Sequence, residues 1–599
     1  MDKRTINSLL INRALKDPDH PCAISKGPDG TWHKMPWSEG MRRIRALAHA
    51  LRSRGVERGD RVAIISNTRA EWVLTDFSIL ALGAVTVGIY PTSTPDQVSY
   101  VLGHSGSKVV FVEDRKMLRQ LKSALGAVDG IRLVVLMAEG ETDENAVSLQ
   151  ALLDEGHALD QKYPSSFLAW AGAVEPDDVC TYVYTSGTTG NPKGAICTHG
   201  NFHHVATVVP QALGLGGHDR SMIFLPLAHS LQRYIIYAGL VIGGEPWFAE
   251  SIEKLPDNLR EAKPTILVAV PRLLEKVRSR VLAARESMSP TRKALFDWAL
   301  AVAMTRSRRI QMGLPVGPVL AAEYDLAGKL VLDKIRERVG GHLRLIGCGS
   351  APLDPAVAEF FHALGITVLE GYGLTETSAP ATINRPHDFR FGTVGKPIPG
   401  VDIKLASDGE VLIRGPGNFR GYHRDREQTA AVIQDGWFHS GDIGELTPDG
   451  FLRITDRKKD LIKTSGGKFI APQYLEGLLR DQPLIGHVVI YGDNKPFVTA
   501  LITLDREQCK QRLGLDGDPA GWSRRDDVRR AVEEAVSRVN AKVARYESIK
   551  KHVLVPDEFT VEAGQLTPTL KLRRKEVSRQ YAHLLEALYE GDAAAAGAA

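Results

Sequence analysis

Short apolar runs alternate with longer segments of helical periodicity along much of the chain. Residues 61–65 and 84–89 are rich in β-branched side chains and predict buried strands. Between them, residues 70–82 repeat apolar side chains at helical spacing, and the same rhythm returns at 222–283 and 343–369. Alternation of this kind is typical of parallel sheets covered by helices, so the pattern predicts an α/β protein with βαβ-type sheets.

Two stretches depart from this rhythm. Residues 289–339 are rich in Ala, Leu, Lys and Arg and carry no strand signal, which predicts a helical insertion. After about residue 397 the pattern changes to short alternating strands, with a hairpin expected from 401–405 and 410–414 around a turn. We expect a small β-barrel-like part there, added to the large N-terminal body.

Five consecutive charged residues at 456–460 predict an exposed joint between two bodies. The chain beyond them mixes short strands with helices and has the size of a small α+β domain. The expected organisation is therefore a domain of residues 1–458 and a smaller C-terminal domain of residues 459–599.

Composition narrows the function classes. With 43% hydrophobic and 24% charged residues, the 599-residue chain has the balance of a globular protein, which excludes disorder of the whole chain. The formal net charge of +4 argues against a nucleic-acid partner recruited by global charge. The five cysteines form no CxxC pair, so a disulfide scaffold and a thiolate zinc site are both disfavoured, and a reducing compartment is expected.

The N-terminal 21 residues lack the apolar core of a signal peptide. The most apolar runs, 79–89 and 234–242, are far shorter than the roughly 20 residues that a membrane helix needs. We expect a cytoplasmic protein. Peripheral contact with the inner face of a membrane, and the oligomeric state, are left open by the sequence.

The strongest chemical signal is YTSGTTGNPKG at 184–194, directly after a predicted strand. Three glycines and four small hydroxyl residues give a loop whose backbone N–H groups and hydroxyls can converge on a polyphosphate. Its spacing is not that of a Walker A loop. On composition alone, an ordinary Ser/Gly turn is an equal alternative.

This loop resembles the phosphate loop of the AMP-forming acyl-CoA synthetase family, which includes luciferases and the adenylation domains of peptide synthetases. Further motifs follow in the order of that family across residues 60–575: GCGSAP at 347–352, EGYGLTE at 370–376, WFHSGD at 437–442, DRKKD at 456–460, SGG at 465–467 and LTPTLK at 566–571. The sequence is identified as a member of this family.

The resemblance implies two half-reactions. A carboxylate first attacks the α-phosphorus of ATP, with Mg²⁺ as the metal, to give acyl-AMP and pyrophosphate. Coenzyme A then takes the acyl group, after the mobile C-terminal domain has rotated about a hinge at Lys459. In both steps the partners are small molecules, namely the carboxylic acid, ATP and coenzyme A, with no nucleic acid.

The family also implies roles for particular residues. Glu376 holds the magnesium ion, Thr375 contacts phosphate, Tyr372 packs against adenine, and Asp442 accepts from the ribose hydroxyls with Arg457 assisting. The nucleotide-binding residues carried over are Thr185, Ser186, Gly187, Thr188, Thr189, Lys193, Gly349, Ser350, Ala351, Glu370, Gly371, Tyr372, Gly373, Asp442 and Arg457.

Three further roles follow from the same motifs. Lys571 is implied to reach the substrate carboxylate and the α-phosphate, although the alternative is one more charge in a basic run. His229 corresponds to the aromatic side chain at the junction of carboxylate and phosphate, although a lone histidine is more often a core residue. Ser465, Gly466 and Gly467 line the coenzyme A path.

Substrate class is the least determined property. The helical insertion and the LTPTLKLRR ending resemble the bacterial long-chain fatty acid–CoA ligase branch. Some long-chain members carry a gating Trp four residues after the position of His229, where this chain has Arg233. An aryl-CoA ligase and an acyl-AMP ligase that loads a carrier protein stay open as alternatives. Intact Glu376, Asp442 and Lys571 argue against a catalytically dead nucleotide-binding module.

Overall fold

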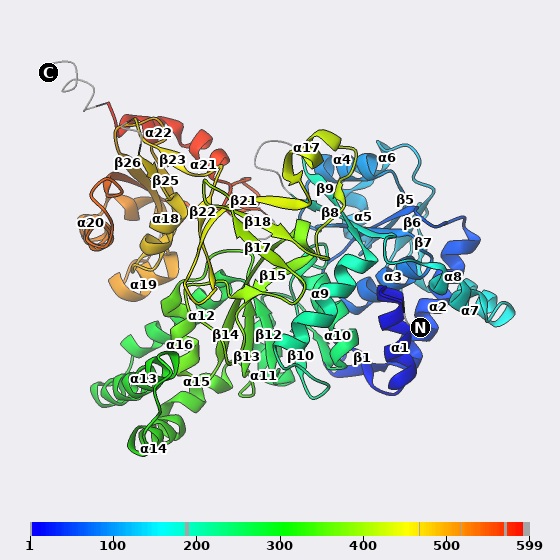
Figure 1. Ribbon diagram of the computed structural model, residues 1–599, viewed down its shortest axis with the longest axis horizontal. Coiled ribbons are helices and arrows are strands. Elements are labelled where there is room, and N and C mark those ends of the chain that lie inside the picture. The colour runs from blue at the N-terminus through cyan, green and yellow to red at the C-terminus, as the bar shows by residue number, and fades with distance from the viewer. Residues whose placement is uncertain (1–2, 186–190, 466–467, 517, 568–571, 591–599) are drawn as a thin grey trace. The chain divides into compact units, whose positions relative to one another are not determined.

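The computed structural model of the protein describes residues 3–185, 191–465, 468–516, 518–567 and 572–590 (Figure 1). The chain forms two compact units. The first comprises Met1–Leu274, Ala294–Lys404 and Leu412–His439, and the second comprises Glu275–Lys293, Leu405–Val411 and Ser440–Ala599. Each unit is described by itself. The expected domain boundary after residue 458 stays a prediction.

An eight-stranded sheet in the first unit has the order β19-β9-β8-β4-β3-β5-β6-β7. Its strands are β3 (Arg61–Ile65), β4 (Val85–Ile89), β5 (Ser107–Val112), β6 (Leu133–Leu136), β7 (Val147–Ser148), β8 (Val179–Thr185), β9 (Lys193–Thr198) and β19 (Gly421–Tyr422). Strand β3 pairs in parallel with both β4 and β5, and helix α3 (Ala70–Ala81) connects β3 to β4. The βαβ pattern predicted for this region is confirmed.

A nine-stranded sheet in the same unit has the order β16-β15-β14-β13-β12-β10-β11-β1-β2. Its strands are β1 (Pro21–Lys26), β2 (Trp32–Pro36), β10 (Arg220–Ile223), β11 (Glu245–Phe248), β12 (Ile266–Ala269), β13 (Leu345–Cys348), β14 (Thr367–Leu374), β15 (Ala379–Ile383) and β16 (Lys396–Pro397). The sheet is parallel from β14 to β1 and antiparallel at both edges.

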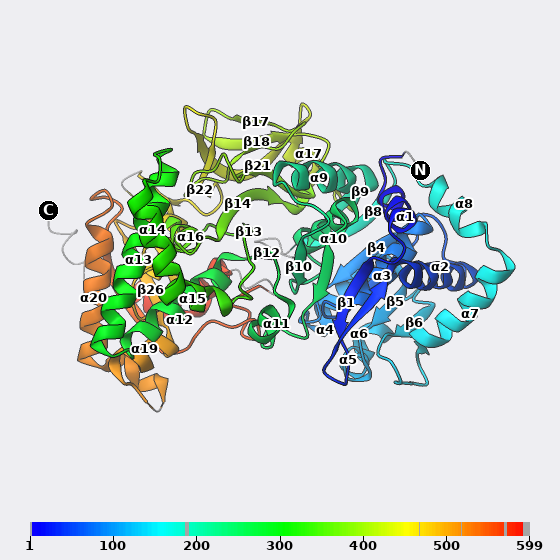
Figure 2. The same ribbon diagram turned by 90° about the horizontal axis from the view of Figure 1, so that it is seen from below.

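Helices of the first unit pack against one another in two groups. Helix α2 (Trp37–Ser53) packs against α3 and α7 (Leu149–Lys162). Gly156 permits the second contact, because a Cβ there would lie 1.8 Å from the carbonyl oxygen of Ala46. Helices α1 (Ile6–Lys16), α9 (His199–Ala212) and α10 (Ser230–Ile242) form another contiguous group (Figure 2).

The predicted helical insertion is confirmed. Helix α12 (Pro271–Glu286) precedes it, and the insertion itself comprises α13 (Pro290–Gln311), α14 (Pro318–Ala327), a π-helical turn (Gly328–Leu332) and α15 (Asp333–Glu337). Helix α14 begins with a proline, whose missing N–H costs nothing at the first turn. In the part of the chain that the structure describes, every helix is too short or too polar to cross a bilayer.

A five-stranded sheet has the order β17-β18-β21-β20, with β22 beside β21. Its strands are β17 (Asp402–Leu405), β18 (Glu410–Arg414), β20 (Ile433–Gln434), β21 (Trp437–Leu446) and β22 (Leu452–Arg457). The second unit contains a sheet of β25 (Ile485–Tyr491), β26 (Val498–Leu504) and β27 (Ile549–Val555), packed with helices α18 (Pro472–Arg480) and α20 (Asp526–Asn540) around one apolar core. Both observations agree with the predicted β-rich part and α+β part.

The charged run at 456–460 is exposed at Arg457, Lys458 and Lys459, as predicted, but not at Asp456. Strand β22 continues to Arg457, so alternation along the strand decides exposure. Asp456 points inward and is 2% exposed, whereas Arg457 points outward. Burial raises the pKa of Asp456 to about 7, against the opposing charge of Arg574.

Candidate active site

The predicted phosphate loop connects two paired strands. Strands β8 and β9 run antiparallel, with Thr185 opposite Lys193, so the two ends of the loop lie side by side. The Lys193 amine donates to Gln428 Oε1 at 2.7 Å and lies 5.3 Å from the centre of the Tyr422 ring. Ser186, Gly187, Thr188 and Thr189 lie outside the described residues.

The two segments predicted to hold adenine are neighbours in the nine-stranded sheet. Strands β13 and β14 are parallel, with Cys348 opposite Glu370. The segments 349–351 and 370–373 therefore begin next to each other, at the same end of the two strands. The backbones approach closely, because a Cβ at Gly349 would lie 3.1 Å from the carbonyl oxygen of Gly371. Ser350 adopts φ = 71°, a left-handed conformation that a side chain makes costly and that is common at functional turns. Ala351, the third predicted residue of this turn, is exposed.

Strand β14 then carries Tyr372 between two glycines. Gly373 must lack a side chain, because a Cβ there would lie 2.0 Å from the carbonyl oxygen of Ala379 on the neighbouring strand. Tyr372 is half-buried and stands opposite Thr382. The structure therefore gathers the predicted adenine residues at one end of β13 and β14.

Glu370 follows the buried residues of β14, and its carboxyl group has a raised pKa. Its Oε1 accepts a hydrogen bond from the backbone N–H of Leu353 at 3.3 Å. Burial raises the pKa of Glu370 to about 8, so the group is mostly uncharged at neutral pH. An uncharged carboxyl beside a nucleotide site does not repel phosphate groups.

This raised pKa predicts a pH effect on ATP binding. Because the folded-state pKa lies above the ordinary value of 4.5, the wild-type carboxyl gains its charge only as the pH rises through about 8. We expect the KM for ATP of the wild type, divided by that of Glu370→Gln, to rise on the order of threefold between about pH 7 and pH 9. A steady-state KM series on both proteins measures the ratio, and a ratio independent of pH would contradict the assignment.

Thr375 and Glu376 form a short 3-10 turn after β14, and both are buried. Glu376 Oε1 accepts a hydrogen bond from the Tyr422 hydroxyl at 2.7 Å, which fixes the direction of the carboxylate. Burial and the adjacent Glu376 raise the pKa of the Tyr422 phenol well above its usual value. The sequence motifs assign no role to Tyr422, and its bond to Glu376 spans 46 residues of chain.

Helix α10 begins beside this turn. Ser230 Oγ lies 3.4 Å from Thr375 Oγ1, and His229 is the N-cap of the helix. The imidazole Nδ1 of His229 accepts from the Leu231 N–H at 3.1 Å. In a neutral ring the proton therefore sits on Nε2, which makes that atom a donor. His229 is half-buried and directly precedes Ser230, and its role at the phosphate junction stays a prediction.

In the second unit, Asp442 and Arg457 stand opposite each other on β21 and β22. Arg457 Nε donates to Asp442 Oδ1 at 2.9 Å, and the backbone N–H of Asp442 donates to Ser440 Oγ. Behind them, Glu410 accepts from the Gly441 N–H and from Lys458, each at 2.9 Å. The structure thus brings the predicted ribose pair together and orients the buried carboxylate.

The other predicted residues of this half stay predictions. Lys459 is exposed after the end of β22. Ser465 is exposed, and its backbone N–H donates to the Lys495 carbonyl at 2.9 Å. Gly466, Gly467 and Lys571 lie outside the described residues.

Comparison with known proteins decides the family. The family model described as AMP-binding enzyme matches residues 10–423, and the model of its C-terminal domain matches residues 459–593. The chain belongs to the AMP-binding enzyme family. The resemblance recognised in the motifs is confirmed, and the motifs at 184–194, 347–352, 370–376, 465–467 and 566–571 lie within the matched regions.

Curated relatives cover almost the whole AMP-binding chain. A long-chain-fatty-acid–CoA ligase of Mycobacterium bovis is 38% identical over 593 residues, which is 98% of this chain and 97% of the relative. Long-chain-fatty-acid–CoA ligase 1 of Cavia porcellus is 30% identical over 629 residues, covering 98% of this chain and 87% of the relative.

Solved structures confirm the predicted fold class. An anthranilate CoA ligase in complex with anthranoyl-AMP superposes with a TM-score of 0.72 at 21% identity, covering 97% of this chain and 98% of that chain. The O-succinylbenzoate CoA synthetase of Bacillus subtilis, in complex with ATP and magnesium ion, gives a TM-score of 0.67 at 21% identity, covering 95% and 98%.

Proposed function

We propose that this AMP-binding enzyme is a long-chain fatty acid–CoA ligase. It activates the acid as acyl-AMP with release of pyrophosphate and then transfers the acyl group to coenzyme A. The observation that carries the proposal is the 38% identity to a long-chain-fatty-acid–CoA ligase over 98% of the chain. ATP, Mg²⁺ and coenzyme A are the required small molecules.

Adenylation brings two anions together, so the site must align them and offset their charge. Lys193 and the phosphate loop bind the triphosphate, Thr375 supplies a hydroxyl, and Lys571 stabilises the charge that builds at the α-phosphorus. Glu376 fits a magnesium ligand, because it is a buried carboxylate held in direction by Tyr422. A bound ion would offset charge on the triphosphate.

The remaining contacts to the nucleotide hold the α-phosphorus in line with the attacking carboxylate. Asp442, held by Arg457, accepts from the ribose hydroxyls, and adenine lies against Tyr372 and the turn at 349–351. His229 donates through Nε2 at the junction of carboxylate and phosphate. The carboxylate oxygen then bonds to phosphorus as the bond to pyrophosphate breaks.

Thioester formation uses a second arrangement of the chain. The C-terminal domain of residues 459–599 turns about Lys459, and Ser465, Gly466 and Gly467 come to line the pantetheine path. The thiolate of coenzyme A attacks the acyl carbon, and AMP leaves. A hinge of this type changes backbone angles at a few residues only.

We place the enzyme in the cytoplasm with peripheral contact at an anionic membrane surface. Residues 311–319 carry no charged side chain, and Met312, Leu314 and Val319 are 70%, 45% and 72% exposed. Arg309 precedes this segment and complements anionic headgroups, whereas Arg308 pairs with Glu359 at 2.8 Å. Cosedimentation with phosphatidylglycerol vesicles tests the contact: Met312→Ser/Val319→Ser should bind less than the wild type, whereas equal binding would contradict it.

Acid profiling tests the substrate class. We expect palmitate to drive both pyrophosphate release and coenzyme A consumption, at least about tenfold faster than benzoate does. A preference for benzoate would identify an aryl-CoA ligase. Palmitate-dependent pyrophosphate release without coenzyme A consumption would identify a ligase that loads a carrier protein.

A further inference from the structure

Arg233 is a fully buried charge that the proposed mechanism does not use. It lies in the second turn of α10, one turn after His229, and is 1% exposed. Its Nη2 donates to Asp76 Oδ1 at 2.6 Å and to the Tyr237 hydroxyl at 2.9 Å, and its Nη1 donates to Thr181 Oγ1. The Tyr237 hydroxyl donates to the other oxygen of Asp76 at 2.7 Å.

These four residues, Asp76, Thr181, Arg233 and Tyr237, form what we call the arginine network. It joins three elements of the first unit, because Asp76 lies on α3, Thr181 on β8, and the other two on α10. The guanidinium also lies 5.3 Å from the centre of the Trp72 ring, one turn before Asp76. The Thr181 hydroxyl in turn donates to the Thr86 carbonyl of β4 at 2.7 Å, so β4 is also connected to the network.

Arg233 connects β8 and α10, and each of these elements ends at a predicted residue of the active site. Strand β8 ends four residues after Thr181, at Thr185, where the phosphate loop begins. Helix α10 begins three residues before Arg233, directly after its N-cap His229, and the Arg233 N–H donates to the His229 carbonyl at 3.3 Å. A shift or rotation of α10 relative to β8 would therefore move His229 relative to the triphosphate-binding loop.

The segment before His229 is held just as tightly. The buried side chain of Gln232 accepts from the Leu225 N–H at 3.1 Å, and Thr68 donates to the Leu225 carbonyl at 2.7 Å. At Gly88 a Cβ would lie 2.8 Å from the Cα of Ala228, so the segment presses on the backbone of β4. The backbone on both sides of His229 is therefore held in place, which fixes the position of its Cα and the starting point of its side chain.

We propose that Arg233 is a positioning residue for adenylation, which sets α10 and His229 against the strand that carries the phosphate loop. This inference rests on the proposed function. A side chain locked by Asp76, Thr181 and Tyr237 has no freedom to swing, so position 233 does not gate substrate entry in this enzyme. Misplacement of reacting groups by about 1 Å can cost 10²-fold in rate.

Thr181→Val and Arg233→Lys test the proposal. Valine has the shape of threonine but removes the acceptor on β8, and lysine keeps the charge but loses the fork that reaches several partners. We expect palmitate-dependent ATP–pyrophosphate exchange to fall by about 10- to 100-fold in both variants. Thioester formation from supplied palmitoyl-AMP should stay within about threefold of wild type, because the triphosphate has left by that step.

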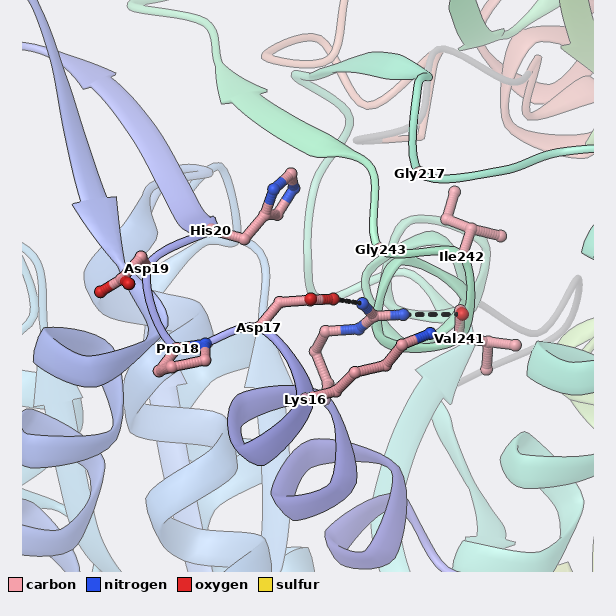
Figure 3. Close-up of a pocket in the computed structure, with 10 residues that line it drawn as sticks. Lys16, Asp17, Pro18, Asp19, His20, Gly217, Val241, Ile242 and Gly243 are labelled. Atoms are coloured by element: carbon pink, nitrogen blue, oxygen red, sulfur yellow. Dashed lines mark hydrogen bonds and ion pairs between the residues drawn. The ribbon is translucent and has the colours of Figure 1, made fainter.

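Arg13 of α1 provides a matched control, because it contacts the C-terminal end of α10. Its guanidinium donates to the carbonyls of Leu240 and Val241 and pairs with Asp17 at 2.6 Å, beside a surface pocket far along α10 from His229 (Figure 3). Arg13→Met should lower the melting temperature and leave the ratio of the two half-reaction rates unchanged.

The melting temperature of each variant shows whether the protein is folded at the temperature of the assay. Selective loss of exchange in Thr181→Val and Arg233→Lys, with an unchanged ratio in Arg13→Met, supports the proposal. An unchanged ratio in the two network variants, or an equal change in Arg13→Met, would overturn it. Failure of the proposed function is distinct, because the wild type itself would then lack palmitate-dependent exchange.

Discussion

Replacing Lys571 with alanine is expected to lower the rate of acyl-AMP formation by about 10²–10³-fold. An ammonium at the α-phosphate stabilises charge that builds only in the transition state of that step. Thioester formation from supplied acyl-AMP should stay near the wild-type rate, because the C-terminal domain has then turned and carried the lysine away. Rapid-quench assays of each half-reaction measure the two rates separately.

Two further variants sharpen this test. Lys575→Ala removes a charge from the same basic run and should change neither half-reaction by more than about twofold, as for an ordinary surface charge. Lys459→Pro should show the reverse of Lys571→Ala, because a fixed φ at the hinge obstructs rotation while the first arrangement survives. If Lys571→Ala slowed both steps equally, the two-arrangement mechanism would be wrong.

Glu376→Gln should lower adenylation by on the order of 100-fold at limiting Mg²⁺, with little change in melting temperature. The amide keeps the shape of the side chain, and its oxygen can still accept the Tyr422 hydroxyl, but the negative charge that a hard cation requires is lost. A titration of the adenylation rate with Mg²⁺ measures the effect.

Tyr422→Phe is the matched control for Glu376. It removes the hydrogen bond at 2.7 Å and keeps the carboxylate charge, so it should cost less than the loss of that charge, about tenfold. Wild-type turnover of Glu376→Gln at limiting Mg²⁺ would show that Glu376 has no part in metal binding.

The elements of the fold were predictable where a local pattern decides the structure. β-Branched runs at 61–65 and 84–89 and the periodic segment between them form β3, β4 and α3. The strand-free composition of 289–339 likewise forms helices. By contrast, the edge hairpin β1–β2 was not predicted, because its second strand, Trp32–Pro36, is short and shows no alternation of apolar and polar residues.

The site was predictable only as far as motifs carry it. Within the first unit the two adenine segments lie on adjacent strands, and within the second unit Asp442 and Arg457 lie on paired strands, both as the motifs predict. The charged run at 456–460 does not reveal that Asp456 is buried, because alternation along β22 decides which of its side chains point inward.

Contacts between distant segments were beyond prediction from single motifs. The Tyr422–Glu376 bond and the arginine network join residues separated by 46 to 161 positions. The sequence does contain a signal for the arginine network. Asp76 lies among apolar residues of α3, Arg233 is the one charged residue of α10, and buried charges occur in pairs.

Product analysis tests the central claim most directly. The protein is incubated with palmitate, coenzyme A and Mg²⁺, with ATP labelled at the α-phosphate, and the nucleotide product is separated. The account predicts labelled AMP in equal amount to palmitoyl-CoA and pyrophosphate, and none without a fatty acid. Labelled ADP with orthophosphate as the primary products would contradict it.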